Sequence, residues 1–165
     1  MAMVSVSEEA WRAHAVAKMP RYHWDFGKAK SYLERGQTPW TPAVSIVFAL
    51  QVALDMMLKE GLSNIFARHA RVGRAARKGV KALGFSVFPD EKYASDTVTA
   101  VAAKSGLDVK KLLKILREEH GIVLSGGQQK LEGKIFRIGH LGWVNEDDIK
   151  DVISALKAAL PRAGV

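Results

Sequence analysis

The hydrophobic period of the chain changes at Gly84, and this change limits the possible folds more than any other feature. Before Gly84, residues 43–60 are apolar on nearly all sides, and residues 63–83 carry apolar side chains at three- and four-residue intervals. After it, FSVF (85–88) and TVTAVAA (97–103) have the composition of strands and flank a Pro-Asp turn region. The sequence therefore predicts two successive long helices and then a mixed unit of strands and helices.

Two helices and two further strands complete the C-terminal half. Asp108 is placed to cap a helix that ends at Gly121, and Asn145 is placed to cap the final helix. The stretches GIVLSGG (121–127) and KIFRIG (134–139) are predicted strands. In this half we therefore expect an α/β unit in which two helices lie on one face of the strands.

The N-terminal segment gives weaker signals. Residues 3–7, MVSVS, alternate apolar and small polar side chains and predict a strand, although no neighbouring segment supplies a partner strand. Residues 8–18 are typical of a short helix, and Asp25 is placed to cap a second one that stops at Gly36.

The long helix over residues 43–60 has a recognisable start and stop. Pro42 suits its first turn, with Thr41 in front of it as N-cap, while Gly61 ends it and Ser63 caps the following helix. Because this helix is apolar on nearly all sides, the sequence predicts that most of its faces are buried.

Length and composition describe an ordinary globular chain. Its 165 residues, 48% of them hydrophobic, suffice for one domain, or for one domain and a fragment of another. The chain has no cysteine, which excludes disulfides and thiolate metal sites. The first residues lack signal-peptide features, and the longest apolar run, 43–58, is too short to span a bilayer. We expect a soluble, cytoplasmic protein with no membrane segment.

The formal net charge of +8 raises the question of a nucleic-acid partner. Much of the charge comes from one predicted helix face, formed by Arg68, Arg71, Arg74, Arg77, Lys78 and Lys81. No aromatic residues alternate with these cations and no nucleic-acid motif follows, so a nucleic-acid partner is not favoured. A solvated face, or one that meets an acidic partner surface, is the preferred interpretation.

Arg137 stands in the middle of the apolar stretch KIFRIG. An arginine that is buried without a partner costs several kcal/mol, so this position requires an anion. The anion is either a carboxylate of the protein, in a structural ion pair, or a carboxylate of a ligand, which the rigid guanidinium fork matches with two parallel bonds. Gly139 and Gly142 favour the ligand, because glycine at a strand end allows close approach.

Other motifs are less specific. Gln37, Thr38 and Thr41 precede a helix N-terminus, where hydroxyls and free N–H groups suit a phosphate, although simple capping by Thr41 is the alternative. The paired glycines of the Ser125–Gln128 stretch suit an anion nest or a sharp turn, and the spacing favours the turn. None of the five histidines has metal-ligand spacing, although His140 is placed to support Arg137. No nucleophile motif is present, and we predict no metal site.

Three stretches together resemble one family: GQTPWTPAVSIVFALQVALDMMLKEGLSNIFARH, GIVLSGGQQKLEGKIFRIGHLGW and the closing helix. They are similar to the C-terminal part of class V aminotransferases, fold-type I enzymes that use pyridoxal 5'-phosphate and include serine–pyruvate and alanine–glyoxylate aminotransferases. The resemblance implies that Arg137 binds the substrate α-carboxylate. It also implies that Thr38 and Thr41, with Gln37 beside them, reach the cofactor phosphate of a neighbouring subunit.

The chain departs from this family in one respect. The family's lysine, which forms a Schiff base with the cofactor, lies in a Ser-x-Ser-x-Lys segment, and the sequence contains no such segment. The aspartate and the aromatic residue that contact the cofactor ring are also missing. We therefore assign no catalytic residue, and expect a C-terminal piece that does not transaminate alone. Its partner is expected to be a second copy or a missing N-terminal domain, joined through apolar surface exposed before Pro20.

The resemblance implies a definite organisation. Residues 1–41 correspond to a remnant of the large cofactor-binding domain, and residues 42–165 to the small domain with its long connecting helix. The expected fold is α/β (α+β), an antiparallel sheet with helices on one face. The implied reaction moves an amino group from serine or alanine to glyoxylate or pyruvate. The alternative is a non-catalytic α/β module that binds a small carboxylate or a protein partner.

Overall fold

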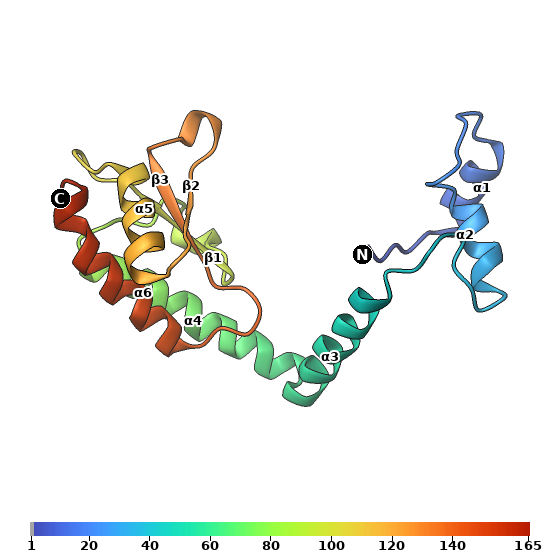
Figure 1. Ribbon diagram of the computed structural model, residues 1–165, viewed down its shortest axis with the longest axis horizontal. Helices are drawn as coiled ribbons and strands as arrows, with labels where there is room; N and C mark the ends of the chain where they lie inside the picture. The colour runs from blue at the N-terminus through green and yellow to red at the C-terminus, as the bar shows by residue number, and fades with distance from the viewer. Residues whose placement is uncertain (1) are drawn as a thin grey trace. The chain divides into compact units, whose positions relative to one another are not determined.

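The computed structural model describes residues 2–165 (Figure 1). The chain divides into an N-terminal unit that ends at Lys59 and a C-terminal unit from Glu60 to Val165. The long helix at residues 44–60 therefore belongs, except for its last residue, to the N-terminal unit. The domain assignment 1–41 and 42–165, which rests on the family resemblance, stays a prediction.

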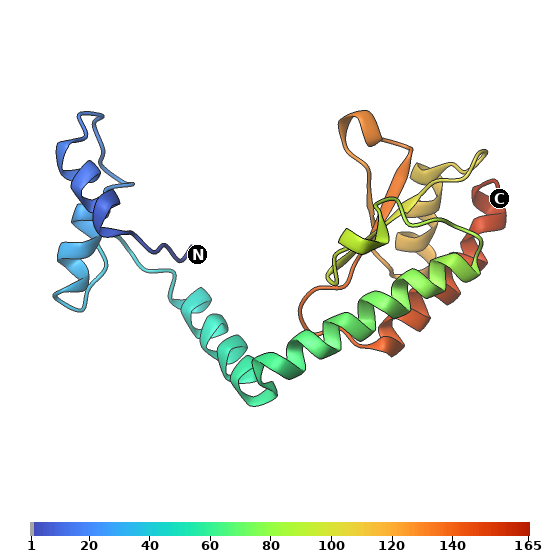
Figure 2. The ribbon, with the colours of Figure 1, turned by 180° about the vertical axis from the view of Figure 1, so that it is seen from behind.

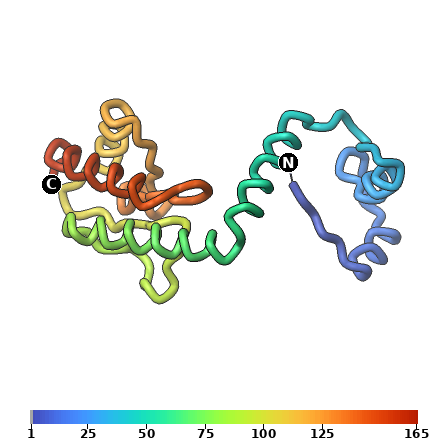
Figure 3. The backbone as a smooth tube through the Cα atoms, turned by 90° about the horizontal axis from the view of Figure 1, so that it is seen from below, coloured from blue at the N-terminus to red at the C-terminus, as the bar shows by residue number. Residues whose placement is uncertain are grey.

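The C-terminal unit is a three-stranded sheet packed against helices. Its main elements are α4 (Leu62–Ala82), β1 (Val98–Ala102), α5 (Val109–His120), β2 (Ser125–Gly126), β3 (Ile135–Gly139) and α6 (Glu146–Ala159). Three short 3-10 helices complete it: η1 (Glu91–Tyr93), η2 (Gln129–Leu131) and η3 (Leu160–Ala163). The sheet is antiparallel, in the order β1-β3-β2. Helices α4 and α6 run side by side (Figures 2 and 3). The expected antiparallel sheet is confirmed.

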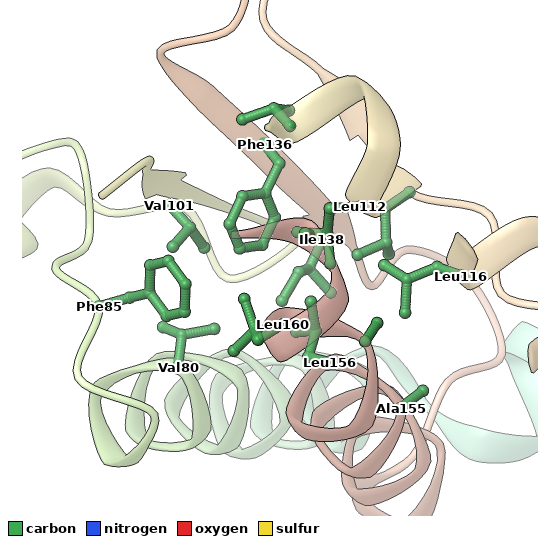
Figure 4. Close-up of a cluster of buried hydrophobic side chains, with 14 of the residues drawn as sticks. Val80, Phe85, Val101, Leu112, Leu116, Phe136, Ile138, Ala155, Leu156 and Leu160 are labelled. Carbon is green, nitrogen blue, oxygen red and sulfur yellow. The ribbon is translucent and has the colours of Figure 1, made fainter. Parts of the chain in front are cut away.

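The two faces of the sheet differ in burial. On one face, Val101, Phe136 and Ile138 are fully or almost fully buried, and they meet Leu156 of α6 and Leu116 of α5 (Figure 4). Most alternate residues of the same strands, such as Ala100, Ala102 and Arg137, are only half-buried, because successive side chains of a strand point to opposite faces; Ile135, at the start of β3, is the buried exception. The helices thus cover one face, and the other face stays open.

The helix caps in this unit follow the local sequence. Asp108 accepts the N–H of Lys111, and Gly121 ends α5 in the left-handed conformation. Asn145 and Asp148 form a reciprocal capping box at the start of α6. The prediction that Ser63 caps α4 is wrong, because Ser63 lies inside the helix, which begins at Leu62 with Gly61 as N-cap.

Two predicted strands are shorter than expected. In 85–88 only Val87 forms a bridge, to Val101, so this segment follows the sheet edge without a regular ladder. In 121–127 only Ser125 and Gly126 pair. The first residues of that stretch complete the helix end instead: the N–H of Ile122 donates to the carbonyl of Leu116 at 2.9 Å and is unavailable for a strand ladder.

The N-terminal unit contains α1 (Glu8–Val16), α2 (Phe26–Leu33) and α3 (Val44–Glu60). Ser7 accepts the N–H of Ala10, and Asp25 accepts those of Gly27 and Lys28, so local caps start α1 and α2. The strand predicted at 3–7 is not formed, since none of the described residues of this unit pairs with it. The predicted exposed apolar surface before Pro20 is confirmed, at Met3, Val4, Val16 and Met19.

Two expectations for α3 are wrong. The helix begins at Val44, whose N–H donates to the carbonyl of Pro42, and Thr41 does not serve as its N-cap. Its faces are not buried: none of its residues is buried, and Phe48 and Leu58 are 64% and 80% exposed. Nothing in residues 2–59 covers this apolar helix.

Candidate carboxylate-binding site

Arg137 lies at the centre of β3, on the open face of the sheet. Its register partners are Ala100 on β1 and Ser125 on β2, which are both small. Its Nε–H donates to the carbonyl oxygen of Gly126 at 3.1 Å. This bond fixes one edge of the guanidinium, while the small neighbours leave space around the other edge.

No carboxylate among residues 2–165 forms an ion pair with Arg137. The structural ion pair, one of the two alternatives for this residue, is therefore not formed within the described chain. The four N–H donors on Nη1 and Nη2 remain for another acceptor. A half-buried guanidinium with this geometry is suited to a carboxylate, which can accept two parallel bonds.

Arg137 lines an open hollow of ≈ 470 Å³, within the usual range for small-molecule sites. One part of the lining is apolar and comes from Phe88, Ala100, Leu131 and Ile135. The other part is polar and comes from Gln128, Gln129 and Lys130. The hollow thus joins one fixed cation to a polar wall, and its described lining contains no acidic residue.

The polar wall belongs to a loop, residues 127–134, with a tightly determined backbone. Gly127 cannot be replaced without movement, because a Cβ there would lie 2.0 Å from the carbonyl oxygen of Leu131. The N–H of Leu131 donates to the carbonyl of Gln128, and that of Lys134 to the carbonyl of Leu131, both at 3.0 Å. Gln129 has φ = 50°, in the left-handed region, which costs a non-glycine residue about 1–2 kcal/mol.

His140, three residues after Arg137, supports the sheet and not the ligand site directly. Its ring is fully buried, with Nδ1 3.1 Å from the carbonyl oxygen of Asp96 and Nε2 2.9 Å from the hydroxyl of Thr99. A carbonyl only accepts, so Nδ1 carries the proton and Nε2 accepts from Thr99. Burial lowers the pKa of His140, and the charge of nearby Arg77 acts in the same direction.

Gln37, Thr38 and Thr41 lie in the connection between α2 and α3 and belong to the N-terminal unit, whereas Arg137 belongs to the C-terminal unit. Gln37 and Thr38 line one open hollow of ≈ 530 Å³, and Thr41 does not. The hydroxyl of Thr38 donates to the carbonyl of Trp40 at 2.6 Å, and Thr41 is exposed.

The chemistry of this segment fits a phosphate group. Thr41 supplies a hydroxyl and Gln37 an amide, whereas the hydroxyl of Thr38 already donates its proton to Trp40. Helix α3 begins three residues after Thr41 with N–H groups that have no partner within the helix. Gln37 and Thr41 can donate to a phosphate group as they stand, and Thr38 can do so only when its hydroxyl turns away from Trp40; the assignment of these three residues to a cofactor phosphate stays a prediction.

The other charged side chains of the described chain give no support to a nucleic-acid or metal ligand. Four of the six cations of the basic face of α4 have carboxylate partners: Arg68 with Glu60, Arg71 with Glu146, Arg77 with Asp96, and Lys81 with Glu91. This agrees with a solvated face. Within residues 2–165 no cluster of three metal-ligating side chains occurs.

None of the helices in residues 2–165 has the length and apolar character needed to cross a bilayer.

Sequence reasoning identified Arg137 but did not assign Gln129 or Lys130 to its surroundings. It treated the glycine pair before them as a turn. The available signal was the order of residues: two glycines and then three long polar side chains, Gln128–Lys130, immediately before the strand that carries Arg137.

Comparison with known proteins gives relatives over nearly the whole chain. No protein-family model matches it. It is 42% identical to a protein named soluble hydrogenase, small subunit, from Synechococcus sp., over 99% of this chain and 42% of that relative. It is 33% identical to serine–glyoxylate aminotransferase from Arabidopsis thaliana, over 99% of this chain and 41% of the relative.

Among solved structures, pyridoxamine–pyruvate aminotransferase from Mesorhizobium loti matches with a TM-score of 0.87 and 36% identity. The match covers 96% of this chain and 42% of that one. The chain therefore spans less than half the length of the proteins that it matches.

Proposed function

Because this chain is related over nearly its whole length to class V aminotransferases, and matches only part of them, we propose that it forms the substrate-carboxylate side of such an enzyme. The proposed reaction moves an amino group from a small amino acid, serine or alanine, to a 2-oxo acid, glyoxylate or pyruvate. The printed names of the relatives, serine–glyoxylate and pyridoxamine–pyruvate aminotransferases, support these substrate classes.

A single observation carries the proposal: Arg137 has no carboxylate partner in the described chain and lines a hollow of small-molecule size. In the proposed site its Nη1 and Nη2 groups donate to the α-carboxylate of the amino acid, and later to that of the oxo acid. The bond from Nε to Gly126 holds the guanidinium plane in place. Both substrates share the carboxylate, so one arginine can orient each of them in turn.

We propose that Gln37, Thr38 and Thr41 hold the phosphate of pyridoxal 5'-phosphate. When bound, that cofactor withdraws electrons from the substrate carbon, and it carries the amino group between the two substrates. The chain's own residues bind and orient. The partner that completes the site is a second copy of the chain or an N-terminal domain, and the exposed apolar surface of α3 is a reason to expect one.

The sequence contains no Ser-x-Ser-x-Lys segment, so this chain is proposed not to transaminate by itself. The purified chain, mixed with pyridoxal 5'-phosphate, L-alanine and glyoxylate, is expected to form no glycine above the background rate. Turnover that depends on one lysine of this chain, identified by borohydride reduction and peptide mapping, would contradict the proposal.

The role of Arg137 is tested by carboxylate binding, which does not need the complete enzyme. We expect L-alanine and pyruvate to shift the NMR resonance of the Arg137 Nε–H. Arg137→Gln and Arg137→Lys lack that resonance, so their binding is measured by isothermal titration calorimetry. Arg137→Gln is expected to abolish binding of both compounds, and Arg137→Lys to weaken it about tenfold, because an ammonium lacks the planar fork. Arg117→Gln, at an exposed position on α5, is the control. Binding that persists unchanged in Arg137→Gln would exclude this role.

A second candidate is a non-catalytic module that binds a small carboxylate or a partner protein. It is favoured by one observation: the hollow around Arg137 is lined entirely by residues of the C-terminal unit, which has its own core. Such a module does not need the threonine segment. Substitution of Thr38 and Thr41 by valine distinguishes the two candidates, because it weakens binding of pyridoxal 5'-phosphate only if the first is correct.

A further inference from the structure

We propose that Gln129 determines substrate specificity: its side-chain amide hydrogen-bonds the side-chain hydroxyl of the amino acid held by Arg137, so that the site prefers serine to alanine. This inference rests on the proposed function, since it assumes that Arg137 binds the substrate carboxylate. It goes beyond that function by naming the group that separates the two candidate amino donors.

The first observation is the backbone conformation of Gln129. Among residues 2–165, nine have positive φ; eight are glycines, and Gln129 is the exception. The same loop uses glycine at its other left-handed position, Gly133, with φ = 72° and no atom within 4 Å of an added Cβ. Strained residues of this kind persist where the surroundings fix them, and they cluster at ligand sites. A glycine would relieve the strain, so the side chain itself needs a reason to be there.

The second observation is that the surroundings do fix Gln129. Gly127 on one side is in close contact with the carbonyl of Leu131, and the carbonyl of Gln129 accepts the N–H of Glu132 at 3.0 Å. Glu132 in turn pairs with Lys110 of α5 at 2.7 Å. The backbone contacts on both sides thus hold Gln129 at the hollow, and the exposed Glu132–Lys110 pair adds only a little to them.

The third observation concerns what Gln129 offers to a ligand. Gln129 lines the same hollow as Arg137, and its exposed side-chain amide forms no hydrogen bond within the part of the chain that the structure describes. An amide both donates and accepts, as does a hydroxyl, so the two groups match. Lys130 next to it can only donate, and Gln128 has an ordinary extended backbone that any residue adopts.

The energetic consequence is a modest preference. Serine gains one neutral hydrogen bond at an exposed position, whereas alanine leaves the amide in water. A hydrogen bond of this kind corresponds to about fivefold in affinity. A larger discrimination requires that the amide be buried and left unpaired by the wrong substrate, and this amide is exposed.

The experiment is a titration of the ¹⁵N-labelled chain with L-serine and with L-alanine, followed at the Arg137 Nε–H resonance. We expect the dissociation constant for serine to be about fivefold lower than that for alanine. In Gln129→Ala and Gln129→Gly this ratio falls to about one. In Gln129→Asn, which keeps an amide and tolerates the left-handed region, the preference is retained. Lys134→Gln, in the same loop but outside the hollow lining, is the control and leaves the ratio unchanged.

Stability separates this role from a structural one. Gln129→Gly is expected to be at least as resistant to urea as the parent chain, because glycine suits the left-handed region. Loss of the serine preference without loss of stability supports the inference. It is overturned if both amino acids bind equally, or if Gln129→Ala keeps the preference. If neither amino acid shifts the Arg137 resonance, the proposed function fails, and the inference fails with it.

Discussion

The two units of the chain differ in the burial of their apolar side chains. In the C-terminal unit, Leu112, Leu116, Phe136 and Leu156 are completely buried. In the N-terminal unit, none of residues 2–59 is buried, although most residues of α3 are apolar. The difference shows that an apolar helix is stabilised by burial, but that it becomes buried only where another apolar surface packs against it. The C-terminal unit contains its second surface, and the described part of the N-terminal unit does not.

The units also differ in what holds their helices. In the N-terminal unit, α1 and α2 begin at side-chain caps supplied by Ser7 and Asp25, a few residues away in sequence. In the C-terminal unit, α4 and α6 pack against a sheet whose strands come from residues almost 40 positions apart, such as Ala100 and Arg137. Local caps start a helix, but tertiary packing provides most of its stability.

The largest effect is expected from matched truncations of phenylalanine in the two units. Phe136→Ala leaves a cavity in the core and should lower the free energy of unfolding by about 3–5 kcal/mol. Phe48→Ala, on exposed α3, should change it by less than about 0.5 kcal/mol at protein concentrations where the chain is monomeric. Urea unfolding followed by circular dichroism measures both. A cost for Phe48→Ala as large as that for Phe136→Ala would break the comparison and show that α3 is covered.

An effect of intermediate size is expected when a charge is placed on α3, and it concerns the association of the chain with a second copy. If the apolar surface of α3 meets a second copy, Phe48→Glu should shift the sedimentation of the chain towards the monomer, because a charge is costly in an apolar interface. Val123→Glu is the matched control, since Val123 is similarly exposed, at 67%, but lies in the C-terminal unit. The opposite pattern, with dissociation by Val123→Glu alone, would place the association surface on the C-terminal unit.

The smallest effect is expected on the pH dependence of stability, through His140. This buried residue tests whether burial in the C-terminal unit has the expected consequence for a titratable side chain. Burial lowers its pKa in the folded chain, so below the ordinary value of about 6.5 the unfolded chain binds more protons at this residue. Its contribution to stability is therefore complete above pH 6.5 and decreases as the pH falls further. Urea midpoints at pH 8, 6.5 and 5 measure this loss. His140→Gln should remove that part of the pH dependence, and an unchanged pH profile would contradict it.

Much of the C-terminal unit could be predicted because its signals are local. Asp108, Gly121 and Asn145 mark helix ends by their own chemistry, and the observed α5 and α6 follow them. The strands at 85–88 and 121–124 could not be predicted correctly, because an apolar run does not reveal whether its N–H groups pair with a strand or complete a helix end.

The candidate site could also be predicted in part from the sequence. An arginine within an apolar strand requires an anion, and this follows from the sequence around Arg137 alone. The sequence did not reveal that no carboxylate of the described chain supplies that anion, because this depends on every side chain that the fold brings near it. Nor did it reveal that Gln129 takes a left-handed conformation beside the hollow.

The sequence by itself determined the helix caps, the apolar strand β3 and the need of Arg137 for a partner, because each follows from side chains within a few residues of one another. Only the tertiary structure decided which apolar surfaces are buried, which loop lines the hollow and which charges pair. Those outcomes depend on distant segments such as Phe88, Ala100 and the 127–134 loop meeting at one face of a sheet. The exposed α3 has the same physical origin: a helix can specify an apolar surface, but not the surface that covers it.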